Sequence, residues 1–262
     1  MNIADINTLN LVAGYLLLIF PLGIILWNRI QIFGQTLLAV ARMTLQLLFV
    51  GLYLRVVFEL NNFWLTGAWL VIMIGVADVS IARGCNLRIG RFAAPLFVSL
   101  LAGTAVPLLF FVGLILKRPF LLDARYIIPI GGMILGNCLR ADIIGIRNFY
   151  EAIQKSQKAF QYTLAQGARL QEAIRPFLRD ACQAALAPTV ATMATIGLVA
   201  LPGMMTGVIL GGADPMTAIK YQIMIMIAIF SGTSITVILA IWLSIKSSFT
   251  AYGLLDYRIF KR

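Results

Sequence analysis

Long apolar stretches without charge alternate with short basic segments along this chain. A helix of about 20 apolar residues crosses the roughly 30 Å hydrocarbon core of a bilayer, and most of the stretches reach that length. The pattern predicts seven spanning helices, near residues 9–28, 36–58, 63–82, 92–116, 126–146, 184–211 and 221–245. The expected fold is therefore all-α, a polytopic membrane protein in which residues 1–262 form a single transmembrane domain.

Composition and charge strengthen this prediction and add an orientation. The chain is 61% hydrophobic and 12% charged, whereas soluble domains carry about 25% charged residues. If the N-terminus lies outside, 14 of the 21 Lys and Arg residues fall on the inner side, 4 on the outer side and 3 within spans. The positive-inside rule then favours N-out, C-in. Since topology explains the net charge of +11, we expect a lipid bilayer as partner and no nucleic acid.

Several kinds of chemistry are missing from the sequence. There is no histidine, which excludes His-based acid–base catalysis and His-ligated metals. The three cysteines are too scattered to predict a disulfide framework or a zinc site. No GxxxxGK[ST] phosphate loop occurs, so the chain is not expected to hydrolyse ATP by that route. We therefore expect neither an enzyme nor a resident cofactor.

One hydrophilic segment, residues 147–180, stands out on the predicted inner side. Its apolar residues Leu170, Ile174 and Phe177 fall on one face of a helix, just after the pair Gly167 and Ala168. Such a helix either rests on the inner leaflet or docks a cytosolic partner. Both interpretations stay open on pattern alone.

A break is expected in the sixth predicted span. The uncharged run 181–213 is too long for one crossing, and it contains Pro202 followed by Gly203. Irregular backbone at membrane depth is tolerated only inside protein or beside water, which favours a gate or pathway here. Deep neutral polar residues and the adjacent methionines complete the candidates for a gate or pathway: Gln46, Asn137, Pro202, Gly203, Met204 and Met205. Methionines more often fill gaps than bind soft metals, so a metal site stays unknown.

Small residues and charges within the spans suggest structural roles. Glycines four residues apart permit close helix packing, and the candidates are Gly132, Gly136, Gly207 and Gly211. Arg140 and Asp142, near the inner end of the fifth span, are expected to be end anchors or an ion pair. Acidic residues are scarce in the spans, so no proton-relay chain is expected.

Several stretches together resemble a known family. They read ARMTLQLLFVGLYL (41–54), IPIGGMILGN (128–137), APTVATMATIGLVALPGMMTGVILGGADP (187–215) and AIKYQIM (218–224). Together they resemble the FetB-type permeases of ABC transporters, and the resemblance runs across nearly the whole chain. The family includes bacterial permeases implicated in iron export and plant relatives linked to aluminium tolerance.

The resemblance implies a permease in the inner (plasma) membrane that pairs with a separate cytosolic ABC ATPase. The implied assembly is two permeases, as a homodimer, with two ATPases that bind ATP and magnesium. Gly167 and Ala168 resemble the Gly-Ala of the ABC coupling loop, which implies ATPase coupling through Gly167, Ala168, Leu170, Ile174 and Phe177. Upstream, Gln161-Tyr162-Thr163 departs from the Glu-Ala-Ala of importer permeases.

Two questions remain open at this level. A stand-alone channel or secondary carrier is one alternative to an ABC permease, and a membrane scaffold with no transport role is another. The substrate is equally open, because the chain has no evident cage of hard oxygen ligands for bare iron. A metal chelate or an organic anion fits as well.

Overall fold

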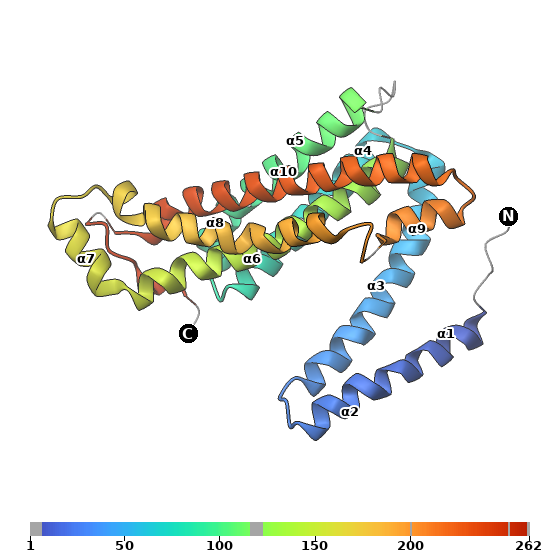
Figure 1. Cartoon of the computed structure of the whole chain (residues 1–262), viewed down its shortest axis with the longest axis horizontal. Helices are drawn as coiled ribbons and strands as arrows, with labels where there is room; N and C mark the ends of the chain where they lie inside the picture. Colours follow the sequence, from blue (N-terminus) through green and yellow to red (C-terminus); the bar gives the residue numbers. More distant parts are fainter. Residues whose placement is uncertain (1–6, 116–122, 200, 251, 261–262) are drawn as a thin grey trace.

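The computed structural model describes residues 7–115, 123–199, 201–250 and 252–260 (Figure 1). The described residues are almost entirely helical, and the β-type pairings between them, such as Leu87 with Phe260 and Phe249 with Leu255, are isolated bridges. The predicted all-α fold class is therefore confirmed.

The helices are named in chain order. An N-terminal arm consists of α1 (Thr8–Gly14), the 3₁₀ helix η1 (Tyr15–Leu18), α2 (Ile19–Trp27) and α3 (Phe33–Leu60). The remainder forms a bundle, whose first part is α4 (Phe63–Gly84), α5 (Ile89–Leu109), the π-helix η2 (Phe110–Ile115), α6 (Ala124–Lys155) and α7 (Gln157–Ala165). The second part is α8 (Leu170–Thr195), α9 (Gly203–Leu210), α10 (Pro215–Ser248) and the short η3 (Tyr257–Ile259).

Six helical segments among the described residues are long and apolar enough to cross a membrane. They are Asn10–Trp27, Phe33–Leu60, Phe63–Gly84, Ile89–Leu114, Ala124–Lys155 and Pro215–Ser248. Each overlaps one predicted span. The predicted span 184–211 differs, because the second half of α8 and the short α9 share it and an irregular segment separates them. The count of seven is thus not reproduced as seven continuous helices.

The direction of the helices explains why α8 and α9 are needed. Gly232 on α10 faces Ile134 and Cys138 on α6, and further along Tyr150 bonds Ser244 and Ser248. The difference in residue number between the contacting residues stays similar along both helices, so α6 and α10 run in the same direction. The chain must therefore return between them. Helix α8, about 39 Å long, makes most of that return.

The centre of the bundle is a close crossing of α5 and α10. A Cβ atom at Gly232 would lie 2.6 Å from the carbonyl oxygen of Gly103, and one at Gly103 would lie 2.8 Å from that of Gly232. Pro107 lies four residues after Gly103 and has no N–H to donate back to it. The Gly103 carbonyl is therefore left to face the neighbouring helix, and glycine at both positions allows this approach.

The arm projects away from this bundle (Figure 1). Helix α3 meets the bundle only near its C-terminal end, where Val57 packs with Ala124 and Ile128. Tyr53 stacks on Trp69 of α4 with ring centroids 4.1 Å apart. In the most apolar 18-residue window of each arm span, none of the residues is buried against the bundle. In the corresponding windows of the four bundle spans, 33–50% of the residues are buried.

The basic end of the bundle is the end formed by the α4–α5 loop (85–88), the α7–α8 turn (166–169) and the C-terminal tail (249–260). The backbone N–H of Arg88 donates to Ile259, and Arg91 pairs with Asp256 at 2.9 Å. Tyr257 donates its hydroxyl hydrogen to Gln157 on α7 at 2.8 Å. These contacts bring three segments that the charge pattern assigned to the inner side to one end of the molecule.

Candidate functional site

The α7–α8 turn is the outermost feature of the basic end (Figure 1). Gly167 has a φ of +90°, a value that favours glycine, and it is exposed with no neighbouring heavy atom within 4 Å of an added Cβ. Ala168 is half-buried beside it. The turn therefore presents the Gly167 backbone to its surroundings, between the exposed side chains of Gln166 and Arg169.

The apolar residues after the turn do not form an exposed face. Ile174 is buried, and Leu170 and Phe177 pack against the main hydrophobic core. Phe177 makes an edge contact with Phe160 of α7, with centroids 6.0 Å apart. The expectation that these three side chains contact a partner or the leaflet is corrected here, because they hold the turn onto its own bundle. The surface left for a partner is polar, with Arg169, Glu172 and Arg175 among its residues.

The boundaries of the predicted segment 147–180 also change. Helix α6 continues without a break to Lys155, and α8 runs from Leu170 through to Thr195. Pro176 and Pro188 are both accommodated inside α8. The hydrophilic segment is thus the end of one long helix, a short α7, a turn and the beginning of another long helix.

The predicted break is present in the structure. Helix α8 ends at Thr195, Gly197 adopts a φ of +87°, and Pro202 is the N-cap residue of α9. Gly203 begins α9 and is exposed, while Met204 packs against the main core and Met205 is half-buried. The irregular segment begins several residues earlier than the Pro202–Gly203 pair.

The two deep polar candidates lie apart from this break. Gln46 is exposed on α3, in the arm. Asn137 is half-buried on α6, and its amide donates to the Met133 carbonyl one turn earlier in the same helix, at 2.8 Å. The structure therefore does not gather the predicted pathway residues into one site within a single chain.

The predicted packing glycines give a mixed result. A Cβ at Gly132 would lie 3.2 Å from the Met73 side chain, so this glycine lies at a helix contact. Gly136 and Gly207 have open space beside them, and the atoms near Gly211 belong to its own helix. Within the chain the close contacts fall instead at Gly103, Gly232 and other glycines outside the predicted set.

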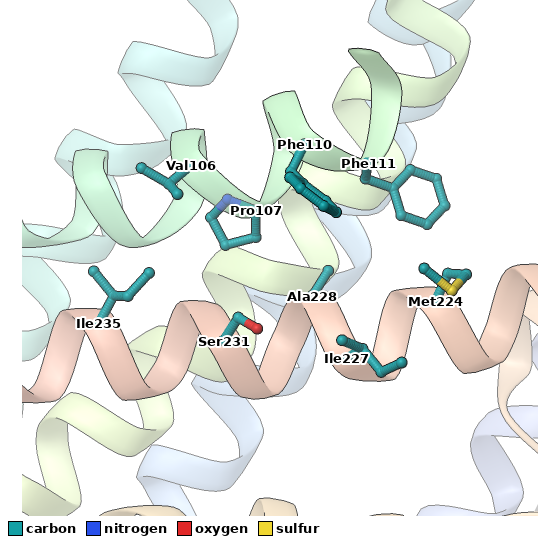
Figure 2. Close-up of a pocket in the computed structure, with 9 residues that line it drawn as sticks. All are labelled: Val106, Pro107, Phe110, Phe111, Met224, Ile227, Ala228, Ser231 and Ile235. Carbon is teal, nitrogen blue, oxygen red and sulfur yellow. The ribbon is translucent and has the colours of Figure 1, made fainter. Parts of the chain in front are cut away.

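An apolar groove separates α5 and α10 on one side of their crossing. Its volume is about 270 Å³, and Figure 2 shows the lining side chains, which come from α5 and η2 on one wall and from α10 on the other. The lining residues are Val106, Pro107, Phe110, Phe111, Met224, Ile227, Ala228, Ser231 and Ile235. Ser231 contributes the only polar side chain among these nine, so the groove suits apolar atoms.

A second, polar cleft of about 460 Å³ opens at the basic end. Its walls include Cys85, Ile146, Arg147, Tyr150 and Glu151. Arg147 bonds the Gly84 carbonyl and approaches Glu151 at 4.0 Å. Burial raises the pKa of Cys85 to about 12, so this thiol stays protonated at neutral pH.

No metal centre is evident in the part of the chain that the structure describes. No group of three or more cysteine, aspartate or glutamate side chains there lies close enough to share an ion. The scattered cysteines are also free, with Cys85 and Cys138 buried and Cys182 half-buried.

Comparison with protein families identifies the chain. The sequence profile of the family described as "Uncharacterised protein family (UPF0014)" matches residues 8–249. The chain belongs to the UPF0014 family. Both this match and the apolar helices make it a membrane protein.

Three UPF0014 relatives are similar over most of their length. UPF0014 membrane protein slr1647 of Synechocystis is 36% identical over 83% of this chain and 84% of the relative. Probable iron export permease protein FetB of Escherichia coli is 31% identical over 96% of this chain and 95% of the relative. Protein ALUMINUM SENSITIVE 3 of Arabidopsis thaliana is 31% identical over 89% and 84%. No solved structure matches the chain.

The structure of this UPF0014 protein corrects the interpretation of one charged pair. Arg140 is exposed, whereas Asp142 is fully buried, and the described ion pairs do not include Asp142. The expected anchor or ion pair is therefore wrong for Asp142. Its spacing of four residues from the buried Cys138 is a sequence signal that places both on one helix face.

Proposed function

We propose that the chain is the membrane permease subunit of an ABC transporter that exports iron or another metal-related substrate. The observation that carries this proposal is the likeness to Probable iron export permease protein FetB over nearly the full length of both chains. The proposed location is the cell's inner (plasma) membrane. Because the sequence has no GxxxxGK[ST] loop, ATP hydrolysis would take place on a separate cytosolic ATPase with bound ATP and magnesium.

The α7–α8 turn is the proposed docking point for that ATPase. It projects from the basic end, which the positive-inside rule assigns to the cytoplasm. Phe160, Phe177 and Phe249 hold it to the ends of α8 and α10 by ring contacts near 6.0 Å. A push on the turn would therefore reach both long helices and, through α8, the irregular segment before α9, which is the proposed gate.

The proposed assembly contains two permeases as a homodimer and two ATPases. The exposed arm favours an assembly with a second copy, because no residue in the most apolar window of either arm span is buried against the bundle. Arg42 and Gln46 lie four residues apart on α3, in the spanning part of this exposed arm. A charged and an amide side chain are costly in lipid and would gain partners at an interface between two copies.

A pull-down tests the docking assignment with a matched pair of variants. The chain, tagged at its C-terminus, is purified in mild detergent, and we expect an ATPase with a phosphate loop to co-purify. Gly167→Arg should abolish this association. Gly197→Arg is the control, because Gly197 has a similar positive φ and the same open surroundings but lies at the α8–α9 break. Equal loss in both variants, or no ATPase with the wild type, would overturn the assignment.

Flux in liposomes tests the transport function itself. The purified complex should export iron, free or chelated, only when ATP and the ATPase are both present. Transport without nucleotide would indicate a stand-alone channel or carrier instead. In the same liposomes, Gly203→Val should stop flux while the complex stays intact, and Gly207→Val on the same short helix should not. Undiminished flux in Gly203→Val would remove the gate assignment.

A further inference from the structure

Asp142 is an acidic side chain buried inside the bundle on the spanning helix α6. Its relative exposure is 0%, and neither carboxyl oxygen accepts a hydrogen bond of good geometry from the described residues, although the neutral Thr236 hydroxyl lies nearby. A carboxylate without a partner is so costly in an apolar interior that the group binds a proton instead of keeping its charge. This packing therefore requires the neutral, protonated acid.

The neighbouring helices bring no compensating charge to Asp142. On α10, the Thr236 hydroxyl lies beside it but donates to the Thr233 carbonyl at 3.3 Å. The charged residues of α10 are Lys220 and Lys246. Each is at least ten residues from Thr236, which is about 15 Å along the helix. On α5, the one charged residue is Arg91, and it pairs with Asp256.

The helices α8 and α4, and α6 itself, also bring no compensating charge to Asp142. Helix α8 presents Ala181 and Ala185 near Gly145, one turn from Asp142. The remaining titratable and charged groups on these elements are Glu172, Arg175, Arg179, Asp180 and Cys182 on α8, Asp78 and Arg83 on α4, Cys85 after it, and Arg125, Tyr126, Cys138, Arg140, Arg147, Tyr150, Glu151 and Lys155 on α6. Lys155 is exposed. The arginines among them are exposed, and Asp78 and the cysteines are acids that cannot neutralise a carboxylate.

The polar cleft at the basic end reaches to within one helical turn of Asp142. Ile146 lines that cleft and lies four residues after Asp142 on the same face of α6, about 6 Å along the axis. Ile146 itself has 0% exposure, so it separates the acid from the water of the cleft. Glu151, which also lines the cleft, is about half exposed and approaches Arg147 at 4.0 Å and Lys155 at 3.7 Å, so this wall of the cleft is polar.

We propose that Asp142 is a proton-binding site of the permease bundle that exchanges with the basic-end cleft. In the packed state the carboxyl group keeps its proton. When α6 moves and Ile146 no longer seals the site, the O–H bond breaks, its electron pair stays on the carboxylate, and the proton passes to water in the cleft. Repacking reverses the step, so no net proton crosses the membrane and alkaline conditions on this side favour the open state.

The proposal rests on burial and geometry and is independent of the ATPase assignment. A single site is also not the proton-relay chain that the sequence argued against. A metal ion is less suitable than a proton as ligand, because no third acidic or thiol group among the described residues joins Asp142 and Cys138.

Infrared spectroscopy of the purified full chain tests the protonation directly. At neutral pH the wild type should show the carbonyl-stretch band of a buried protonated carboxyl group. Asp142→Asn, which resembles the neutral acid in size and charge, should lose this band, and Asp180→Asn, at an exposed acid, should keep it. An unchanged band in Asp142→Asn, or no such band in the wild type, would overturn the proposal.

Deuterium exchange of the same band tests the route. Ile146→Ala should accelerate exchange of the carboxyl proton by about tenfold or more, because removing the seal lowers the cost of local opening. Ile134→Ala is the matched control, a fully buried isoleucine on α6 on the other side of Asp142 from the cleft. Equal acceleration in both variants, or none in Ile146→Ala, would exclude entry through the cleft. Neither measurement uses transport or an ATPase, so its failure is distinct from failure of the proposed function.

Discussion

The arm and the bundle have similar hydropathy but different environments. The two arm spans have mean hydropathies of 2.1 and 1.8, within the range of 1.5–2.3 for the bundle spans. The bundle nevertheless buries Gly103, Gly232 and Asp142 between helices, while arm side chains such as Phe20 and Leu52 are more than 70% exposed. Apolar character thus determines entry into the membrane, and small or polar groups determine which helices pack with one another.

The largest expected difference concerns glycines inside the spans. Gly232→Leu should destabilise the protein by about 3 kcal/mol or more, because a Cβ there meets the Gly103 carbonyl oxygen and backbone cannot rotate away. Gly51→Leu in the arm should be tolerated, since it has open space around it. Thermal unfolding in detergent, followed by size-exclusion chromatography, measures both. If both variants unfold alike, the arm is packed in solution as tightly as the bundle.

A smaller difference is expected between two tyrosine hydroxyls. In the bundle, the Tyr150 hydroxyl bridges Ser244 and Ser248 at 2.7 and 2.6 Å and is fully buried. Tyr150→Phe should cost about 1–3 kcal/mol, since two serines lose a buried partner. Tyr15→Phe in the arm removes one bond to Thr44 at 2.6 Å and should cost about 0.6 kcal/mol. A larger loss of thermal stability for Tyr15→Phe would contradict this ranking.

The smallest expected effect is a change in stability at acidic pH, and it concerns Asp256 at the basic end of the bundle. Hydrogen bonds from Arg91 and Arg258 hold the pKa of Asp256 below its usual range. Its ionised form therefore stabilises the fold at pH values above the ordinary aspartate pKa of about 3.9, and this contribution disappears as pH falls through the lower folded pKa. The stability advantage of wild type over Asp256→Asn should shrink below about pH 4.

The arm again supplies the control for that pH series. Arg55 and Glu59 approach at 3.5 Å, but their side chains are 82% and 70% exposed. Exposed pairs of this kind contribute little, so Glu59→Gln should leave thermal stability unchanged. If the difference in stability between wild type and Asp256→Asn stays constant as the pH falls through the acid range, the Arg91 contact does not depend on charge.

Much of the fold followed from local sequence patterns. Hydropathy predicted 63–82 where α4 spans Phe63–Gly84, and 221–245 within α10. The break before α9 followed from a run that was too long for one helix and contained Pro202. Such features depend on residues close in sequence, since the length of a span and a missing N–H act locally.

The candidate site followed less well from sequence. The helical face of Leu170, Ile174 and Phe177 was correctly periodic, but periodicity gives no indication of which surface covers an apolar face. The packing glycines were sought at a four-residue spacing, whereas Gly103 and Gly232 meet between helices far apart in the chain. A contact of this kind depends on the mutual placement of two helices.

The sequence by itself determined that this protein lies in a membrane, where its helices run and which segments carry the basic charge. Each of these follows from the free energy of transferring short segments between water and lipid. The tertiary structure decided that the first turns of α8 direct their apolar face inward, that α5 and α10 touch through backbone, and that Asp142 has no counter-charge. Those outcomes depend on which helices pack together, because lipid and a neighbouring helix are about equally apolar and hydropathy cannot distinguish them.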